Sequence, residues 1–483
     1  MAGRRMSLRT VKRAVTAAVV LAVLAVALPV AYDWWDDRRS RCAEGVVRME
    51  PDGECVGVTD GSHTFADHLD EVTDRIREAN EKVVGEDGDA YVSVAYMTSF
   101  TVGEADSNSE ESVRHELQGA YLAQQRHNEF SAPKIRLLIA NTGSESRHWK
   151  HTVGELVRRK DNGERLVAVT GLGPSTGPNR EALNELSKHE LAMVASTMTA
   201  TDFHGIEGFV RVAPTNVDEA RVASAYLRQE GFHTAMVVQD VAKKNPYART
   251  LGRAFTEEFP KGGGGHRLVA RKKTFDSSVS GNWRVELRYL SDQLCIHKPQ
   301  AVYFAGRGQH LTHFLNALAN RACPEWGFTV MTGDDTSNLT SEQVRKAVDS
   351  GVQVFYTGLA HPEMWRGDPK GPPRRLQNAF RKGGLLDQWF AGESHADGQA
   401  MMAHDAVLTA AEGARMVNHG RSQVTGEAVS RMFHQMQDNM RLRGASGPLS
   451  FESDGDAYDK AVPILRLDPN GTPVFVTVLS PGE

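Results

Sequence analysis

The segment at residues 173–177, with sequence GPSTG, has the spacing G-x-S-x-G, which is typical of a serine nucleophile. An apolar run precedes the segment and a helical pattern follows it, as in the strand–turn–helix of α/β hydrolases. Asp397 and His404 follow in the chain as a candidate acid and base, but no His-Gly-Gly-Gly sequence precedes the serine to form an oxyanion loop. Three hypotheses stay open for Ser175: a hydrolase nucleophile, a helix cap, or an anion-binding hydroxyl beside free backbone N–H groups.

Polar residues also follow two other apolar runs. Residues 196–201 carry four hydroxyl side chains in six positions, and Asp334 and Asp335 follow the run 328–332. Hydroxyls at a strand end can be turn or capping groups, or donors at the edge where open α/β sheets bind ligands. The paired aspartates could cap a helix, bind a cation or accept hydrogen bonds from a ligand ammonium. The sequence predicts no metal site and no cofactor, because the remaining candidate ligands lack metal-ligand spacing: His361, His395 and His404.

The elements that must position these residues alternate between two patterns from residue 90 onward. Polar stretches with helical periodicity, such as 111–126, 216–229 and 246–259, separate short apolar runs. Such alternation predicts an α/β fold with parallel sheets covered on both faces. The strands are too many for one compact sheet, so we expect two doubly wound lobes. The apolar runs are 91–97, 135–140, 166–170, 191–195, 234–239, 268–275, 301–305, 328–332 and 352–356.

The C-terminal part has a different pattern. Residues 396–416 and 424–440 predict two helices, and three short strands follow them at 448–451, 464–467 and 474–478. The Gly-rich stretch 262–265 lacks the Lys-Ser/Thr that would complete a phosphate-binding loop, so it predicts a surface turn.

Composition and charge exclude several classes of protein. The 483 residues are 40% hydrophobic and 24% charged, with a net charge of -5, which indicates a folded chain of two or three domains. Five cations lie within residues 1–13, and beyond them the basic runs are short, such as 271–273. Nucleic-acid binding requires a basic face, so nucleic acid is not expected as a partner.

The uncharged segment Ala14 to Tyr32 predicts one transmembrane helix. Its 19 residues would span about 28 Å at about 1.5 Å per residue, which matches a bilayer core. Because cations precede the segment and acids follow it, we expect residues 1–13 in the cytoplasm, an uncleaved anchor at 14–32 and the bulk of the chain outside the cell membrane. The alternative is a cleaved signal peptide, for which residues 25–27 have the small-x-small form.

Four cysteines occur in the chain, and an exported domain favours their pairing. Four cysteines allow three connectivities, and the two short-loop pairings are the expected choice among them. Those pairings join Cys42 to Cys55 and Cys295 to Cys323.

Several motifs, in order along residues 90–480, resemble the leucine/isoleucine/valine-binding proteins of ABC transporters, which have the type I periplasmic-binding fold. Residues 91–97 resemble the opening strand of that family, and 166–175 resemble its strand and serine loop. The stretch 193–203 resembles the next strand with its hydroxyl loop. The segment Phe209–Pro214 resembles the first crossover of the family, and 301–306 and 331–335 resemble later strands. The segments 444–451 and 455–456 resemble its closing pattern.

The resemblance implies two lobes that close on a ligand and are joined by three crossovers. Lobe one would be 90–206 with 357–445, and lobe two 207–356 with 447–483. The sequence before them departs from the family, because it predicts a separate juxtamembrane segment at 33–89. The crossovers are expected near 205–209, 354–359 and 443–448.

The resemblance also implies a binding site between the lobes. The carboxylate of an amino acid would contact Ser175 or Thr176, with Thr197 and Thr199, and its ammonium would contact Asp335. Tyr247 matches a family tyrosine in lobe two. The segment 307–309 replaces an aromatic position of the family, a departure that argues against a branched aliphatic ligand.

These observations predict a membrane-anchored, extracellular solute-binding protein rather than an enzyme. It would close on a small polar ligand, such as an amino acid or a related zwitterion. Its partner would be an ABC permease in uptake or a membrane signalling protein in sensing. The alternatives are a serine hydrolase that uses Ser175, and a sensing or assembly module with no transport role.

Overall fold

The computed structural model describes residues 41–86, 91–103, 105–339, 341–369, 371–419, 423–468, 470 and 472–482, with the single residues 12 and 16. The predicted anchor, Ala14 to Tyr32, lies outside this described part apart from residue 16. Among the residues that were placed, no helix is both long and apolar enough to cross a membrane.

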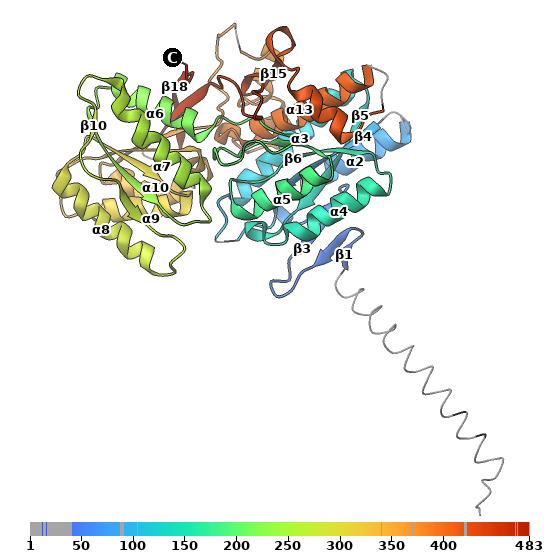
Figure 1. The fold of residues 1–483 in the computed structure, drawn as a ribbon, viewed down its shortest axis with the longest axis horizontal. Helices are drawn as coiled ribbons and strands as arrows, with labels where there is room; N and C mark the ends of the chain where they lie inside the picture. The colour runs from blue at the N-terminus through green and yellow to red at the C-terminus, as the bar shows by residue number, and fades with distance from the viewer. Residues whose placement is uncertain are drawn as a thin grey trace, which may run out of the picture.

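Two lobes lie side by side, each built on one sheet with helices on both faces (Figure 1). The sheet of lobe one has the order β1-β2-β3-β5-β4-β6-β7-β8. From β5 to β8 neighbouring strands are parallel, whereas β1, β2 and β3 add to the edge in antiparallel fashion. The strands are β1 (Arg41–Ala43), β2 (Val46–Arg48), β3 (Cys55–Thr59), β4 (Tyr91–Thr98), β5 (Lys134–Asn141), β6 (Leu166–Gly171), β7 (Ala192–Ala195) and β8 (Phe209–Arg211).

Helices cover both faces of this sheet because its strands are apolar on both sides. One face packs against α2 (Asp70–Glu86), α3 (Glu110–Phe130), α13 (Gln399–His419) and α14 (Gly426–Phe433), and the core there includes Leu117 and Ala403. The other face packs against α4 (Trp149–Asp161) and α5 (Gly177–Lys188), through residues such as Leu156 and Leu183. The short helices α11 (Arg374–Ala379) and α12 (Leu385–Trp389) contribute Leu376 and Leu386 to the first core.

Lobe two repeats this plan with the strand order β10-β9-β12-β13-β14-β17-β18. The strands from β10 to β14 are parallel, β11 pairs with the end of β9, and β17 and β18 are antiparallel additions. Its strands are β9 (Thr234–Asp240), β10 (Arg267–Leu268), β11 (Lys273–Phe275), β12 (Ala301–Ala305), β13 (Thr329–Thr332), β14 (Gln353–Thr357), β17 (Val462–Leu467) and β18 (Pro473–Leu479). Its helices are α6 (Asn216–Gln229), α7 (Pro246–Glu258), α8 (Asn282–His297), α9 (Gly308–Ala319) and α10 (Ser341–Asp349).

Three segments cross between the lobes, as predicted, but two of them lie further along the chain than expected. The first crossing runs from the end of β8 to Thr215, which caps α6, because residues 209–211 pair with β7 in lobe one. The second follows β14, in the expected place. The third lies between β17 and the small hairpin of β15 (Leu442–Gly444) and β16 (Gly447–Leu449).

Residues 41–86 are part of lobe one, which corrects the prediction of a separate segment at 33–89. Strand β3 pairs with β5, with Val58 opposite Ala140, and Val72 and Ile76 of α2 lie in the core. The sequence pattern did not predict β1 and β2, because each has only three residues and no regular alternation.

Both expected disulfides are present. Cys42 on β1 is joined to Cys55 on β3, with Cα atoms 6.0 Å apart. Cys295 in α8 is joined to Cys323, with Cα atoms 5.8 Å apart. The first bond fastens the added strands at the edge of lobe one, and the second fastens α8 to the loop before β13.

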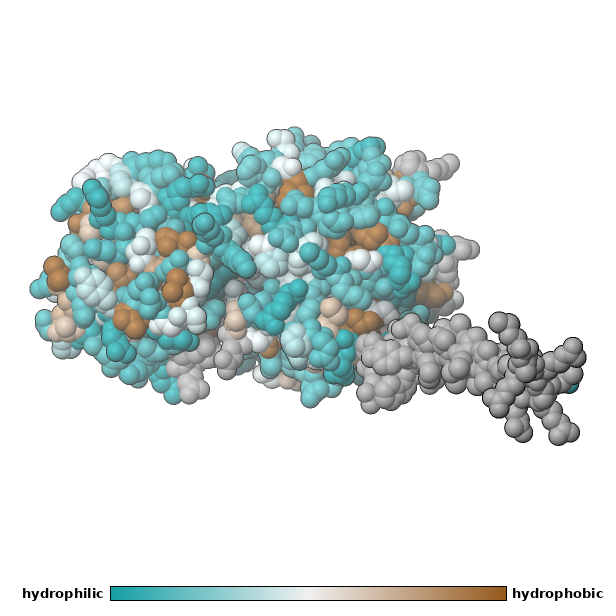
Figure 2. Space-filling view, turned by 60° about the horizontal axis from the view of Figure 1, so that its bottom comes forward, coloured by the Kyte–Doolittle hydropathy of each residue, from teal (hydrophilic) through white to brown (hydrophobic). Residues whose placement is uncertain are grey.

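The surface seen in Figure 2 is mainly hydrophilic. On this face the hydrophobic residues lie in small separate groups over both lobes.

Candidate functional site

A cavity of about 740 Å³ lies between the lobes, at the ends of their strands. Its lobe-one wall is formed by the loops after β4, β5 and β6, and its lobe-two wall by the loops after β9, β11 and β12. The carboxyl ends of all six strands point toward the cavity. Open α/β sheets bind ligands at this edge of the sheet.

The serine loop is fixed by hydrogen bonds to the hydroxyl loop that follows β7. The Oγ atom of Ser175 accepts hydrogen bonds from the backbone N–H groups of Thr199 and Ala200, each at 3.1 Å. The hydroxyl of Thr176 accepts a bond from the N–H of Asn179 and caps α5. Thr176 lines the cavity, whereas Ser175 is almost completely buried. The motif therefore does provide the N-cap of α5, but the capping residue is Thr176 and not Ser175.

Three buried hydroxyls of the loop after β7 lack partners among the described residues, and two of them belong to predicted site residues. The Oγ1 atoms of Thr197 and Thr199 are buried, and no hydrogen-bond partner for either lies among the described residues. A buried hydroxyl without a partner is costly, so a ligand or a water molecule is expected to satisfy each of them.

A fully buried arginine holds that same loop. The guanidinium of Arg211 donates to the carbonyl oxygens of Met198 and Ala200 at 3.0 and 2.9 Å, and to that of Phe203. Its Nε atom lies 2.7 Å from Oδ1 of Asp456, in the third crossing segment. One side chain thus links the hydroxyl loop to a connection between the lobes.

On the lobe-two side, Asp335 and Tyr247 surround the guanidinium of Arg307. Nη1 of Arg307 lies 3.2 Å from Oδ1 of Asp335, and its Cζ lies 4.6 Å from the centre of the Tyr247 ring. The Tyr247 hydroxyl accepts a bond from the N–H of Asp335 at 3.3 Å, and the N–H of Gly308 donates to Oδ2 of Asp335 at 2.5 Å. Burial raises the pKa of Asp335, and Arg307 partly offsets that effect.

Arg307 also reaches across to lobe one, where it donates to the carbonyl oxygen of Ser175. The structure therefore brings three predicted site residues, Ser175, Asp335 and Tyr247, around one cation that belongs to the protein. Arg307 thus occupies the contact with Asp335 that the resemblance assigns to a ligand ammonium. The departure noted at 307–309 is thus at the centre of the site.

Two buried carboxylates next to this site were not predicted from the sequence. Glu116 in α3 accepts a hydrogen bond from the Tyr96 hydroxyl at 2.6 Å, and burial raises its pKa to about 7. Glu219 in α6 accepts bonds from the Thr357 hydroxyl at 2.6 Å and from the N–H of Asp334 at 3.1 Å. Both glutamates lie within polar helical stretches, where spacing gave no signal that the side chain is buried.

Asp334, the residue before Asp335, forms a buried acidic pair with Glu219. Burial, with the charge of Asp335, raises the pKa of Asp334 to about 7, and burial raises the pKa of Glu219 as well. A carboxyl with a raised pKa in the folded state stabilises the fold below its unfolded pKa, and that stability is lost as the pH rises through the folded pKa.

We therefore expect the protein to lose about 2 kcal/mol of unfolding free energy between pH 5 and pH 8 through this pair. Asp334→Asn should remove most of that pH dependence, because the amide carries no charge. Urea unfolding at the two pH values measures the effect, with Asp292→Asn on the exposed surface of α8 as the control. An unchanged pH dependence in Asp334→Asn would contradict this interpretation.

The hydrolase hypothesis finds no support at Ser175. Within the described chain, no histidine hydrogen-bonds to its hydroxyl, and the candidate partners lie elsewhere. Nδ1 of His404 is 2.9 Å from Oδ1 of Asp405, and Asp397 contacts His115.

A fluorophosphonate probe is therefore expected to leave Ser175 unlabelled, because the hydroxyl is buried and has no general base. Mass spectrometry of the treated protein provides the measurement. Labelling that disappears in Ser175→Ala would revive the hydrolase hypothesis.

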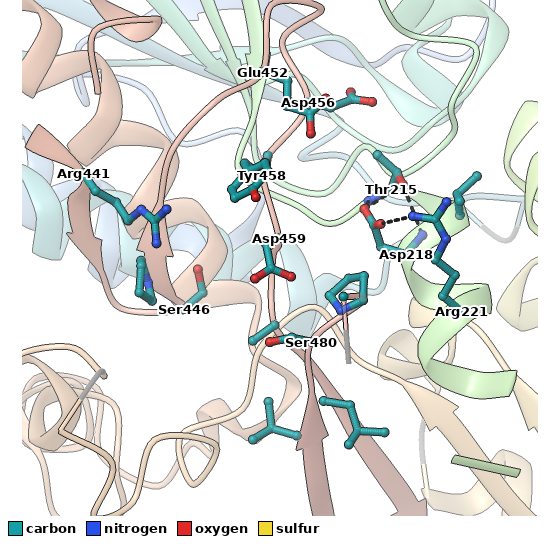
Figure 3. Close-up of a pocket in the computed structure, with 18 of the residues that line it drawn as sticks. Thr215, Asp218, Arg221, Arg441, Ser446, Glu452, Asp456, Tyr458, Asp459 and Ser480 are labelled. Carbon is teal, nitrogen blue, oxygen red and sulfur yellow. Dashed lines mark hydrogen bonds and ion pairs between the residues drawn. The ribbon is translucent and has the colours of Figure 1, made fainter. Parts of the chain in front are cut away.

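A second cavity, of about 940 Å³, lies among the crossing segments (Figure 3). In Figure 3, Asp459 lies between Arg441 and the ion pair of Asp218 with Arg221, whose charged atoms are 3.7 Å apart. Asp218 also accepts hydrogen bonds from Thr215, the residue that caps α6. Because Asp218 binds both Arg221 and the residue that caps α6, next to the first crossing, we assign this cavity to the hinge and not to the ligand.

Comparison with known proteins identifies the fold. Neither a family model nor a curated sequence relative matches the chain. A leucine-binding protein from Thermotoga maritima has a similar structure, with a TM-score of 0.62 and 16% identity over 81% of this chain and 99% of that one. A branched-chain amino acid transporter substrate-binding protein from Streptococcus pneumoniae, in complex with isoleucine, has a TM-score of 0.61 and 14% identity, covering 81% and 99%.

A third similar structure has a different ligand. A solute-binding protein of an ABC transporter from Rhodopseudomonas palustris, in complex with 3,4-dihydroxybenzoic acid, has a TM-score of 0.59 and 14% identity, covering 81% and 97%. The chain thus has the type I periplasmic-binding fold, which confirms the resemblance seen in the sequence.

Proposed function

We propose that this protein is a solute-binding protein whose two lobes close on a small organic carboxylate. The observation that carries the proposal is the position of Arg307, where the two lobes meet. Its guanidinium lies between Asp335 and Tyr247 of lobe two and the serine loop of lobe one. A ligand that binds in this cleft would stabilise the closed state by its higher affinity for that state.

The charge of the cavity favours an anion. Four cationic side chains line it against two carboxylates, Asp106 and Glu145. Asp106 accepts bonds from its own loop, including the Ser144 hydroxyl at 2.7 Å, and Glu145 pairs with Arg147. The cations are Arg147, Lys244, Arg284 and Arg307.

A hydroxyl in lobe one suits the same ligand. The hydroxyl of Thr176 lines the cavity and can donate to a carboxylate oxygen, and Arg307 can bind a carboxylate with two parallel hydrogen bonds. The hydroxyls of Thr197 and Thr199 are buried and do not line the cavity. Ser175 would act through the loop that it holds in place.

The body of the ligand would pack against aromatic rings. Trp149 of lobe one and Trp283 of lobe two both line the cavity. The similar structures contain isoleucine in one case and 3,4-dihydroxybenzoic acid in another, so the fold accepts both zwitterions and aromatic carboxylates. Two tryptophans and a surplus of cations favour the second type of ligand here.

Thermal melting with a panel of small ligands tests the proposal. A ligand at 100 times its dissociation constant adds about 2.7 kcal/mol of stability, which gives a clear shift in Tm. We expect aromatic and aliphatic monocarboxylates to raise Tm, and the matching neutral amides to leave it unchanged. A shift produced equally by acid and amide would contradict recognition of the negative charge.

An amino acid is the second candidate, because Asp335 matches the family position that receives an ammonium group. A zwitterion would have to displace Arg307 from Asp335. The variants in the Discussion separate the two candidates.

In this proposal the segment Ala14 to Tyr32 anchors the protein in the cell membrane, with the lobes on the extracellular side. The two disulfides support an oxidising location. The lobes would deliver ligand to an ABC permease or report it to a signalling partner. Mass measurement of the membrane-extracted protein tests the anchor, since cleavage would leave an N-terminus near Leu28.

A further inference from the structure

A buried cluster of two histidines and a glutamate lies in lobe one, apart from the residues assigned to the ligand. One ring nitrogen each of His115 and His395, and a carboxylate oxygen of Glu393, lie within 4.8 Å of one another. His115 belongs to α3, and the other two lie on the loop before α13. Both histidines are buried, whereas Glu393 is partly exposed.

The contacts around the cluster orient its ring nitrogens. Nδ1 of His115 lies 2.7 Å from Oδ2 of Asp397, which leaves Nε2 facing Glu393 at 3.0 Å. Nε2 of His395 lies 2.7 Å from the side-chain oxygen of Gln118, and a bond donated there leaves the lone pair of a neutral imidazole on Nδ1. Histidine ligands of metal ions are commonly oriented in this way, by a carboxylate or carbonyl group on the second nitrogen.

The carboxylate of Glu393 is also held in place. Arg114 Nε lies 3.1 Å from both of its oxygens, and the Gln118 amide donates to Oε2 at 3.2 Å. Ligand atoms around a tetrahedral zinc ion lie about 3.3 Å apart, because each bond is about 2.0–2.1 Å long. Nε2 of His115 and Oε2 of Glu393, now joined by a hydrogen bond of 3.0 Å, would separate only slightly around such an ion, which would displace the proton between them.

A cavity of about 450 Å³ gives access to the cluster. Glu393 and His395 form part of its wall, together with His361, Glu363 and Asp387. An ion could therefore reach the two ligands on the loop without separation of the lobes.

We propose that His115, His395 and Glu393 form a binding site for a divalent late first-row metal ion of the Zn²⁺ type. Two imidazoles and one carboxylate are a ligand set that zinc uses in proteins, with the fourth position left for water. The ion would tie the first half of α3 to the loop before α13. This inference is independent of the ligand in the cleft, and it differs from the sequence-based prediction of no metal site.

Calorimetric titration of the chelator-treated full chain with zinc chloride tests the site. We expect one equivalent to bind, a higher Tm with zinc, and the visible absorption of a tetrahedral complex when Co²⁺ is used instead. Glu393→Gln and His395→Gln should abolish detectable binding. Asp397→Asn should weaken it about 10- to 100-fold, because it removes the group that orients His115.

The matched control is His148→Gln. His148 lies with Asp52 and Glu54 in the other group of potential metal ligands found among the described residues, near the surface. We expect this variant to bind zinc as the parent does. The proposal is overturned if the parent binds no zinc, or if His148→Gln loses binding while Glu393→Gln retains it. Should His395→Gln fail to fold, Glu393→Gln and Asp397→Asn decide the question.

Discussion

Arg307→Met is expected to weaken binding of a carboxylate ligand by about 2–5 kcal/mol. The substitution keeps much of the length of the side chain but removes the guanidinium that links Asp335, Tyr247 and the Ser175 carbonyl oxygen. The loss has two sources: the charge-assisted bonds to the ligand disappear, and Asp335 keeps a buried charge without its partner. Calorimetric titration with a carboxylate found in the melting panel measures the effect.

The companion variant Asp335→Asn separates the two candidate ligands. If the ligand is a carboxylate, Asp335→Asn leaves Arg307 with its full charge and binding is retained or strengthened. If the ligand is an amino acid whose ammonium contacts Asp335, the variant loses about 2–5 kcal/mol of affinity. Arg253→Met, on the exposed surface of α7, is the matched control for an arginine outside the cleft. Full affinity in Arg307→Met would exclude the proposed anion contact.

Arg211→Met is expected to lower the free energy of unfolding by about 3–5 kcal/mol. The guanidinium is fully buried, and its removal leaves Asp456 and the carbonyl oxygens of the loop after β7 without their donor. Leaving such buried groups unpaired costs more than the hydrogen bonds themselves contribute. Urea denaturation measures the loss. Because the loop also holds Ser175, whose carbonyl oxygen binds Arg307, ligand affinity should fall as well.

Arg221→Met provides the control for Arg211. Arg221 pairs with Asp218 at 3.7 Å, but its side chain is 48% exposed, so removal of this pair should cost no more than about 1 kcal/mol. Equal losses in the two variants would show that Arg211 contributes no more than a surface ion pair.

The amino-acid sequence by itself determined the fold class, most of the strands and the position of the serine loop. Strands such as 91–98 and 301–305 are continuous apolar runs, and helices such as 216–229 carry an apolar stripe, so each is specified by neighbouring residues. The serine and hydroxyl loops were found for the same reason, since each directly follows a strand. The short-loop disulfides were also predictable, because few pairings were possible.

Only the tertiary structure decided which charged groups meet. Arg307 contacts Ser175 from 132 positions away, and His115 contacts Glu393 across 278 positions. The hydrophobic periodicity of the sequence does not predict such a contact, because the distance between two side chains on different elements depends on how sheets and helices pack. The same holds for Glu116 and Glu219, whose burial follows from the neighbours that the fold gives them. Local pattern therefore determined the elements and the loops at their ends, whereas the charge of the cleft, and with it the class of ligand proposed here, emerged only when the two lobes were placed against each other.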